Sequence, residues 1–425
     1  MPANPSITLT LFLLVNLASA SLQTHCPHDA LNPLSPIPNS SPIQINFETR
    51  PPFPPHTPWT NRPFCDTLIE KEGKEQEFCV YSSSSYNLNS GLSILTTPET
   101  AAGLATAVSS NFKPHWDARV HLAEKGVLDS NESTRPYKYI KMPGRGLGVV
   151  ATRKIKQFET IMTNFPTVII DNAFFSESEE ENGNEDAADL FEKMLQQLGD
   201  IERVLSLARS RGEGVHVIED AVRTNAFGMT LNGRKSKGLF PEIARMNHAC
   251  DPNAFPRFSA RSLAMTAIAT REILPGEEIT ISYIPVGMST PSRQTHLANW
   301  HFNCTCALCS APAQAREASD SRREQILELL YGMQEPSTSY ETLIEMTREF
   351  IELAQVERLI TKVGEYYQVL MKLFYEKGDP ESARKYGRAA LMFGEIFSDA
   401  EGEFCAGLRE DLEVVERVIS ESGGS

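Results

Sequence analysis

Cysteines constrain the fold of this chain more than any other residue type. Three of them, Cys304, Cys306 and Cys309, stand in the run FNCTCALC, and Cys250 stands earlier in the run RMNHACDPNA. Thiolates spaced C-x-C-x-x-C can converge on one tetrahedral zinc ion, and a structural zinc site normally has a fourth protein ligand. Cys250 is the nearest candidate, so the sequence predicts that two distant segments meet at one metal. Disulfides, or thiols unrelated to one another, are the alternatives.

The remaining cysteines and the N-terminus concern the compartment in which the chain folds. Residues 9–17, LTLFLLVNL, with ASA at 18–20, resemble a secretory signal, although no Lys or Arg precedes them. This run is too short to span a bilayer, and no later stretch predicts a membrane span. A secreted chain could pair its other cysteines in three ways, whereas a reducing compartment would leave them as thiols. These cysteines are Cys26, Cys65, Cys79 and Cys405.

The charge balance bears on partners. The chain has 40 Lys and Arg against 55 Asp and Glu, which gives a net charge of −15. Nucleic-acid-binding proteins usually present a basic surface, so direct nucleic-acid binding is not expected. An acidic surface favours a basic protein partner, although it can also serve solubility alone. A chain of 425 residues is long enough for several domains.

Changes in composition divide the first part of the chain. After the signal-like residues 1–20, residues 21–75 are rich in proline and are expected to be extended or poorly ordered. Residues 76–136 are expected to form an N-terminal β/α segment. Its clearest predicted strands are EFCVYSS (77–83) and GLSILTT (91–97).

Strand and helix patterns alternate in the middle of the chain. Apolar residues recur at helical spacing from Leu190 to Ala208, which predicts one amphipathic helix over 187–209 and a second over 217–227. Other runs have the composition of buried strands. These predicted strands are GVVAT (148–152), PTVII (166–170), LAMTAIA (263–269) and EITISYI (278–284).

Beyond residue 312 the apolar period is helical throughout, which predicts stacked antiparallel helices over 313–425. The turn Gly378-Asp379-Pro380 and the small Ala383 give one helix pair a tetratricopeptide-like appearance. A single such unit is visible, so a plain helical bundle is the alternative.

Four motifs stand in the order typical of the SET-domain family: GRGLGVVAT (144–152), RMNHACDPNA (245–254), PGEEITISY (275–283) and FNCTCALC (302–309). Over roughly residues 137–310 the chain resembles SET-domain protein lysine methyltransferases. The helical C-terminal region is similar to the SET-and-MYND branch of that family. That branch inserts a zinc-binding MYND module, but residues 172–215 contain no cysteine, so the layout resembles the MYND-less fungal relatives.

This resemblance implies an α+β fold. A β-rich SET domain with a pseudoknot is expected at 137–285, with a helical insertion at 172–227. A zinc-binding post-SET segment is expected at 286–312, followed by the α-helical, tetratricopeptide-like region 313–425.

The resemblance also assigns contacts with S-adenosylmethionine. Asn247 would meet the polar end of this cofactor, while the main chain of His248 would hydrogen-bond its adenine. The family's G-x-G turn lines the cofactor, because glycine allows the backbone to approach a ligand closely. The turn residues assigned to it are Arg145, Gly146 and Leu147.

Four further residues match family positions. Asn225 and Phe227 match an Asn-x-Phe phrase, which implies a cofactor contact and a lining of the substrate channel; an ordinary helix end is the alternative. Phe302 matches the aromatic residue that stacks on adenine. Trp300 stands where relatives often place a channel Tyr, a departure that bears on the number of methyl groups added.

Catalysis is assigned by the resemblance to Tyr283, which would also contact the cofactor; simple core packing is the alternative. The implied reaction is in-line transfer of a methyl group from the sulfonium to a neutral lysine amine. Tyr283 would orient that amine. Zinc, held by the four cysteines named first, would clamp the post-SET segment over the cofactor.

The sequence therefore predicts an S-adenosylmethionine-dependent protein-lysine N-methyltransferase that acts on a basic, lysine-containing protein, whether a histone or not. An inactive SET scaffold that binds a partner through its helical tail is the alternative. A secreted, disulfide-stabilised binding protein is a third interpretation. Methyltransferase chemistry implies the nucleus or cytoplasm, whereas residues 1–20 indicate the secretory route.

Overall fold

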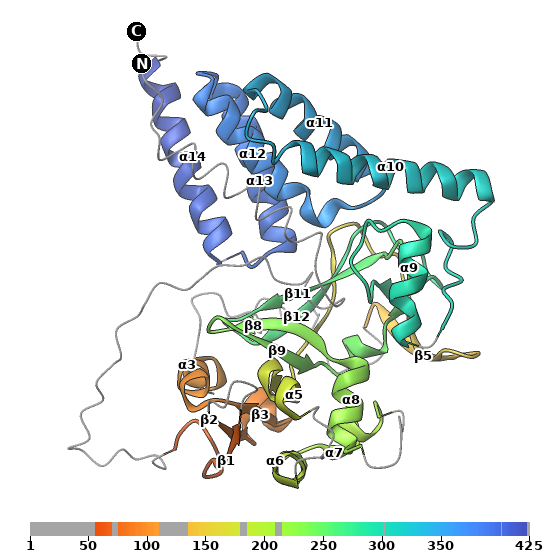
Figure 1. The fold of residues 1–425 in the computed structure, drawn as a ribbon, viewed down its shortest axis with the longest axis vertical. Helices are drawn as coiled ribbons and strands as arrows, with labels where there is room; N and C mark the ends of the chain where they lie inside the picture. The colour runs from red at the N-terminus through yellow and green to blue at the C-terminus, as the bar shows by residue number, and fades with distance from the viewer. Residues whose placement is uncertain are drawn as a thin grey trace.

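The computed structural model describes residues 56–69, 75–109, 135–178, 185–208, 215–300, 302–400 and 402–422. The signal-like residues 1–20 and Cys26 lie outside these ranges. β-Sheets occupy one part of the molecule and the C-terminal helices another, and helix α9 (Thr290–Leu297) lies near their junction (Figure 1). Of the helices in the described ranges, none has the length and apolar character that crossing a membrane requires.

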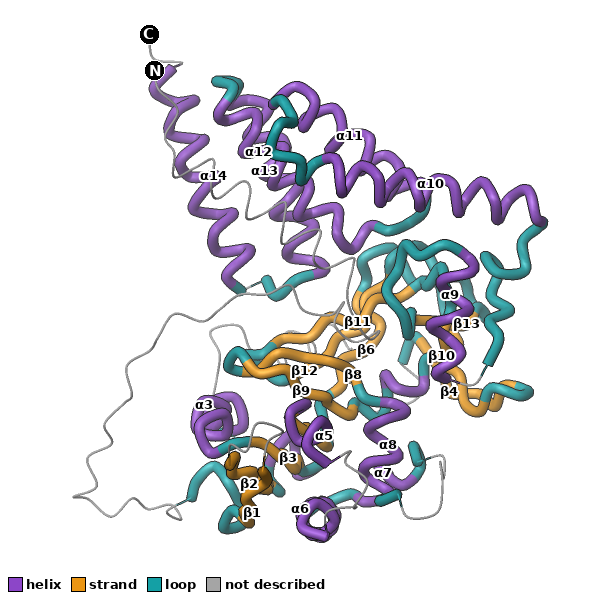
Figure 2. Tube along the Cα trace, in the orientation of Figure 1, coloured by secondary structure: helices purple, strands orange, loops and turns teal. Residues whose placement is uncertain are grey.

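The strands of the described ranges form three sheets, and Figure 2 shows their arrangement. Their bounds are β1 (Phe64–Ile69), β2 (Glu75–Ser83), β3 (Leu92–Thr96), β4 (Tyr137–Met142), β5 (Gly146–Ala151), β6 (Thr160–Asn164), β7 (Val168–Asp171), β8 (Phe227–Leu231), β9 (Arg234–Leu239), β10 (Asn247–His248), β11 (Ala254–Ser259), β12 (Ala264–Ala269) and β13 (Glu278–Ile281). The large sheet has the order β1-β2-β3-β7-β9-β8, and the smaller sheets have the orders β10-β13-β5-β4 and β11-β12-β6.

The large sheet is buried on both faces, which explains the continuous apolar run in β2. Phe78 and Val80 point into a core shared with the helices at 172–225, while Cys79 and Tyr81 point into the core shared with the other sheets. Successive side chains of a strand point to opposite faces, so a strand covered on both sides needs apolar residues throughout.

The N-terminal strands belong to the same sheet as later strands, because β3 pairs in parallel with β7. Strand β1 lies within the proline-rich region 21–75, so of the two expectations for this region, extended or poorly ordered, residues 64–69 meet the first. β1 pairs with β2, and a disulfide joins Cys65 to Cys79 across this pair. Of the other two cysteines, Cys405 is a buried free thiol.

Short helices precede and interrupt the strands. The single helix predicted over 187–209 was wrong, because two separate helices, α6 and α7, cover this region. Gly199 lies between them, and glycine is among the least favourable residues in a helix interior. The second prediction, 217–227, is confirmed apart from its last residues. These helices are α2 (Tyr86–Asn89), α3 (Pro98–Val108), α5 (Asn172–Ser178), α6 (Glu185–Gln196), α7 (Ile201–Leu205) and α8 (Val217–Asn225).

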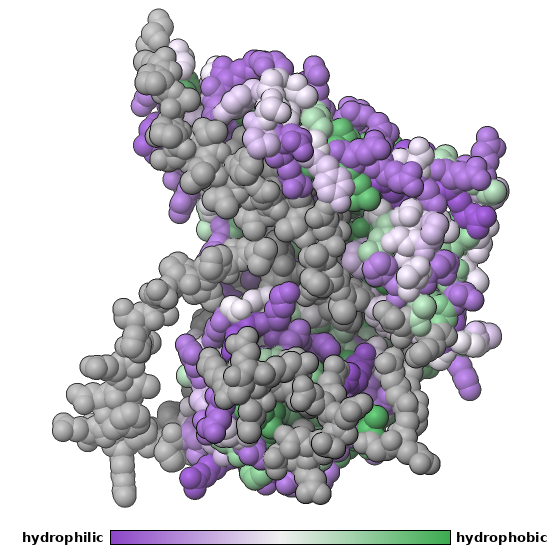
Figure 3. All heavy atoms as spheres, viewed as in Figure 1, coloured by the Kyte–Doolittle hydropathy of each residue, from purple (hydrophilic) through white to green (hydrophobic). Residues whose placement is uncertain are grey.

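The helical C-terminal region is confirmed, and we call its helices α10–α14 the helical tail. They are α10 (Ala313–Gly332), α11 (Tyr340–Val356), α12 (Val363–Glu376), α13 (Pro380–Phe397) and α14 (Glu403–Ser422). Asp379 caps α13 by accepting a hydrogen bond from Ser382 N at 3.0 Å, and Gly378 has φ +80°. The predicted turn is therefore confirmed. Hydrophilic side chains cover most of the described face in Figure 3, because the tail buries its apolar residues in a core of its own.

The tail contacts the sheets through strand β11. Arg257 Nη1 donates to Glu395 O at 2.7 Å and to Ile396 O at 3.0 Å, near the end of α13. Beside it, the rings of Phe255 and Phe397 meet edge to face with centroids 5.7 Å apart. Strand β11 carries none of the four cysteines of the two motifs.

Candidate active site and cysteine cluster

A cavity of about 830 Å³ lies where the β4–β5 hairpin, the end of α8, strand β13 and the segment after α9 come together. Most of the residues assigned from the sequence form part of its wall. Gly146, Leu147 and Phe227 do not, although Gly144, next to Arg145, does. The assigned residues in the wall are Arg145, Asn225, Asn247, His248, Tyr283, Trp300 and Phe302, together with Cys304 and Cys306 of the predicted metal site.

The tip of the β4–β5 hairpin brings Arg145 to the cavity. Gly144 and Gly146 on either side have φ values of +71° and +73°, a region that side chains disfavour and glycine tolerates. The Arg145 guanidinium makes two contacts with Glu278, Nη2 to Oε2 at 2.9 Å and Nη1 to Oε1 at 3.3 Å. The hairpin tip is thereby tied to the start of β13.

Asn247 belongs to the short strand β10, which pairs in parallel with β13. Its Nδ2 donates to Glu278 Oε1 at 2.9 Å and to Leu147 O at 3.4 Å. A Cβ atom on Gly148 would lie 3.0 Å from this amide nitrogen, so glycine is needed where the hairpin passes Asn247. Leu147 thus takes part through its main chain, while its side chain is exposed.

His248 lies between the cysteines and Tyr283. Its Nδ1 accepts a hydrogen bond from Tyr283 N at 3.0 Å, so the proton of the neutral ring sits on Nε2, which lies 3.2 Å from Cys250 Sγ. Burial lowers the pKa of His248 to about 4, so the ring is neutral near pH 7 and is not poised as a general base.

The Tyr283 ring stands in a group of aromatic side chains. Its hydroxyl donates to Met246 O at 2.8 Å, and its ring centroid lies 6.0 Å from that of Trp300. Phe302, which is 37% exposed, lies 6.0 Å from the His248 ring. This part of the cavity therefore combines flat apolar surfaces with one oriented hydroxyl.

Asn225 and Phe227 have different surroundings. The Asn225 amide donates to Leu207 O at 2.8 Å and to Ala221 O at 3.1 Å, so this side chain secures the end of α8 while it borders the cavity. Phe227 is buried in the central core, where its ring packs on Phe240. Asn225 therefore lines the cavity as expected, whereas Phe227 does not line it.

The four cysteines of the two motifs form one cluster, which we call the cysteine cluster. Their Sγ atoms all lie within 4.8 Å of one another, and Cys250 Sγ lies 3.8 Å from Cys304 Sγ and 3.6 Å from Cys309 Sγ. A tetrahedral zinc ion with Zn–S distances of about 2.3 Å separates its sulfur ligands by about 3.8 Å. Hydrogen bonds among the thiols lower the pKa of Cys306 and raise those of Cys250 and Cys304, so without a metal the group shares one thiolate, while the sulfur spacing matches that of four zinc ligands. The donor set therefore fits zinc.

Several cavity residues were not assigned from the sequence. For Glu277 and Glu278, the signal in the sequence was a pair of acidic residues at the start of a predicted strand, where a charged side chain can face a site. Asn253 Oδ1 accepts from Thr280 N at 2.8 Å and its Nδ2 donates to Glu278 O at 2.8 Å, which joins the segment after Cys250 to β13. Asp251, next to Cys250, also lines the cavity.

Comparison with known families matches residues 146–284 to the family described as "SET domain". This segment of the chain is a SET domain. The match begins at Gly146, directly after Arg145 of the hairpin tip, and ends one residue after Tyr283, so it contains Asn247, His248 and β13. The four-cysteine cluster combines Cys250 of the SET domain with three cysteines that follow it.

Relatives of the chain are named as lysine methyltransferases. Histone-lysine N-methyltransferase set5 of Schizosaccharomyces pombe is 28% identical over 196 residues, which cover 45% of this chain and 56% of that protein. Histone-lysine N-methyltransferase SMYD3 of Mus musculus is 38% identical over 73 residues, 17% of each chain. N-lysine methyltransferase SMYD2 of Homo sapiens is 28% identical over 116 residues, 25% of this chain and 26% of that protein. The chain thus matches about half the length of the first relative and less of the others.

Proposed function

We propose that this chain transfers a methyl group from S-adenosylmethionine to the side-chain amine of a lysine in a protein. One observation carries the proposal: Tyr283 and Asn247 of the SET domain and the adjoining Arg145 border one cavity. The names of the relatives support the same chemistry.

The residues of the cavity suit the roles proposed for them. S-adenosylmethionine supplies an electrophilic methyl group on a positively charged sulfur. Arg145, Asn247 and Glu278 offer both charges and an amide for a zwitterionic ligand, and Phe302 offers a flat surface for a base. Tyr283 donates its proton to Met246 O, and its oxygen can still accept a hydrogen bond from a lysine amine.

Proton transfer needs no separate base in this proposal. A free lysine has a pKa of about 10.4, and an apolar channel and a nearby positive charge both lower it. Tyr283 and Trp300 would surround the amine and exclude water. Alignment of the amine with the methyl carbon then supplies most of the rate enhancement.

We propose that the cysteine cluster holds one zinc ion. Zinc bound to four thiolates is closed to substrates and serves structure. Here it would join Cys250, two residues after His248, to the segment that carries Trp300 and Phe302.

Further properties remain our proposals. The net charge of −15 supports a basic protein substrate rather than nucleic acid. Parallel pairing of β10 with β13 supports the pseudoknot of the SET fold. Helices α12 and α13, which a short turn joins and which lie side by side (Figure 1), support a tetratricopeptide-like unit.

Methyltransferase activity on lysine would place the protein in the nucleus or cytoplasm. A reporter fused to residues 1–20 would test the secretory alternative.

The test is methyl transfer from labelled S-adenosylmethionine into a lysine-rich protein extract, followed by hydrolysis and identification of the labelled amino acid. Labelled methyl-lysine is expected, and an extract with chemically blocked lysines is the control. Cofactor binding without label in any extract would favour the inactive scaffold. Absence of cofactor binding would overturn the catalytic proposal.

A further inference from the structure

Helix α10 of the tail contacts both the cysteine cluster and helix α9. Arg316 Nη1 donates to Cys309 O at 3.3 Å. One turn later, Asp320 Oδ1 accepts from Thr290 N at 2.8 Å and from Thr290 Oγ1 at 3.1 Å. Thr290 is the first residue of α9, whose leading N–H groups lack partners within the helix. Asp320 therefore caps α9 from another helix.

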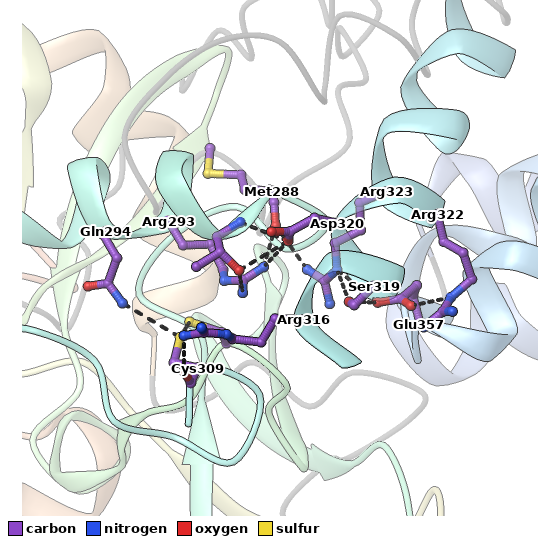
Figure 4. Close-up of polar contacts among 12 residues, drawn as sticks. Met288, Arg293, Gln294, Cys309, Arg316, Ser319, Asp320, Arg322, Arg323 and Glu357 are labelled. Carbon is purple, nitrogen blue, oxygen red and sulfur yellow. Dashed lines mark hydrogen bonds and ion pairs between the residues drawn. The ribbon is translucent and has the colours of Figure 1, made fainter. Parts of the chain in front are cut away.

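Helix α9 in turn holds the loop that carries three of the cysteines. Gln294 Oε1 accepts from Cys304 N at 3.4 Å, and Gln294 Nε2 donates to Cys304 O at 3.5 Å and to Cys309 Sγ at 3.7 Å. Figure 4 shows Gln294 and Arg316 both reaching toward Cys309, Gln294 from the left of the view and Arg316 from the right. The orientation of α9 thus decides whether Gln294 can reach the cysteine loop.

Two buried arginines set that orientation. Arg293 and Arg323 are each 1% exposed, and both donate through Nη1 to Met288 O, at 2.6 and 3.2 Å (Figure 4). Met288 lies just before α9. A buried guanidinium needs a counter-charge, because an unpaired buried charge is strongly destabilising. For Arg323 that counter-charge is Glu357, with Nε and Oε2 at 2.8 Å.

Glu357 lies at the end of α11 and binds α10 at three points. Besides Arg323, it accepts from Ser319 Oγ at 2.6 Å and from Arg322 Nε at 2.6 Å. The next residue, Arg358, has φ +57° and turns away from Glu357. Its Nη1 lies 2.7 Å from Oδ2 of Asp251, the neighbour of Cys250.

Both halves of the cysteine cluster are therefore tied to one turn of the tail. One series of contacts runs from Glu357 to Arg323, then to α9, and through Gln294 to the loop of Cys304–Cys309. A second runs from Arg358 to Asp251, the neighbour of Cys250. The contacts of the first series are buried. The side chain of Arg358 is 58% exposed, and exposed ion pairs contribute little to stability.

We propose that Arg323 and Glu357 are positioning residues for the cysteine cluster: they hold α9 so that Gln294 keeps the cysteine loop in place, and Arg358 adds a weaker hold on Asp251. The helical tail is then a support for the zinc site and the cavity wall beside it. This inference rests on the proposed zinc site.

The test uses the full, zinc-loaded chain and measures the rate at which a chelator with a metal-sensitive dye removes zinc. Arg323→Met and Glu357→Gln should speed release about tenfold, and Arg358→Ala about twofold. Arg257→Met is the control, because it also removes a guanidinium, here half-buried, that donates to main-chain carbonyls between the tail and the sheets. Arg257→Met should release zinc at the same rate as the unaltered chain, even if its Tm falls by as much as that of Arg323→Met.

Affinity for S-adenosylmethionine, measured by calorimetry, is the second readout and should weaken in parallel for Arg323→Met but not for Arg257→Met. Should Arg323→Met fail to fold, Arg323→Met/Glu357→Leu removes both charges and keeps the apolar volume. That double variant should recover its Tm yet still release zinc faster, because Met288 O lacks its second donor.

Equal release rates for Arg323→Met and the unaltered chain would overturn the inference, as would equal acceleration by Arg257→Met. The inference would also be overturned if the folded double variant released zinc at the same rate as the unaltered chain. If the unaltered chain binds no zinc, the proposed zinc site fails, and this inference fails with it. A chain that holds zinc but methylates nothing would defeat the proposed activity alone.

Discussion

The Tyr283 hydroxyl donates a hydrogen bond to the main-chain carbonyl of Met246 at 2.8 Å, while the main-chain N–H of Tyr283 donates to His248 Nδ1 at 3.0 Å. Both ends of the residue are thus held by the segment that carries Asn247. A hydroxyl held in this way has a set direction in the cavity, which is the requirement for a group that orients a substrate amine.

Removal of that hydroxyl provides the first prediction. Tyr283→Phe keeps the ring beside His248 and Trp300 but leaves Met246 O without this donor. We expect kcat to fall about a hundredfold and stability to fall by about 1 kcal/mol, with cofactor affinity little changed. Radiolabel transfer, calorimetry and thermal unfolding measure the three quantities.

Tyr366→Phe is the control for this variant. The Tyr366 hydroxyl is buried in the tail and has no hydrogen-bond partner among the described residues, so its loss should leave activity unchanged. Unaltered kcat in Tyr283→Phe would remove Tyr283 from the proposed mechanism.

Metal content provides the second prediction. We expect one zinc ion per chain by elemental analysis, and Cys304→Ser should lose it because a serine hydroxyl is a much poorer zinc ligand than a thiolate. Cys405→Ala, at the buried free thiol of the tail, should keep its zinc. Zinc retained in Cys304→Ser, or no zinc in the unaltered chain, would argue against the four-thiolate site.

The contact between Glu278 and the hairpin tip provides the third prediction. Glu278→Gln removes the charge that pairs with Arg145 and weakens the bond from Asn247. The tip should loosen and the Kd for S-adenosylmethionine should rise about fivefold to tenfold, since each factor of ten corresponds to about 1.4 kcal/mol.

Glu272→Gln is the matched control for Glu278→Gln. The ion pair between Glu272 and Lys154 is exposed on both sides, and exposed pairs contribute little. Calorimetry should therefore give an unchanged Kd for Glu272→Gln. The same Kd for both variants would show that the Glu278 charge has no part in binding.

Acid sensitivity of the tail provides the fourth prediction. Burial of Glu357 opposes ionisation, but hydrogen bonds from Ser319, Arg323 and Arg322 outweigh it and lower the pKa of this carboxyl. A lowered pKa in the folded state contributes stability above the unfolded value of about 4.3, and that contribution disappears as pH falls through the folded value.

Thermal unfolding at a series of pH values tests this. The difference in Tm between the unaltered chain and Glu357→Gln should be largest above pH 5. This difference should become smaller as the pH falls below about 4. A gap that stays constant across this range would mean that Glu357 contributes through shape rather than charge.

Local patterns were sufficient for much of the fold. The strands at 77–83 and 91–97 follow from runs of strand-forming residues, and the helix beginning at Val217 follows from helical spacing of apolar residues; both signals depend on near neighbours. The joining of β3 to β7 could not be predicted, because parallel strands are linked by long crossovers that carry no turn signal. Strand β1 was missed because its composition is mixed and its neighbours are rich in proline.

The sequence by itself determined which chemistry is available: the grouping of Cys250 with three later cysteines, the Asn247-His248 pair, and Tyr283 at the end of a strand. The Cys304–Cys309 run and the Asn247-His248 pair are residue types at short spacing, whereas Cys250 was grouped with that run as the nearest candidate and Tyr283 was assigned by the resemblance to the SET-domain family. Only the tertiary structure decided that Glu278 ties Arg145 to Asn247, and that Glu357 and Arg358 reach the two halves of the cysteine cluster. Charged side chains can pair with any opposite charge that folding brings within about 4 Å, so their partners depend on the packed arrangement of distant segments rather than on the residues beside them.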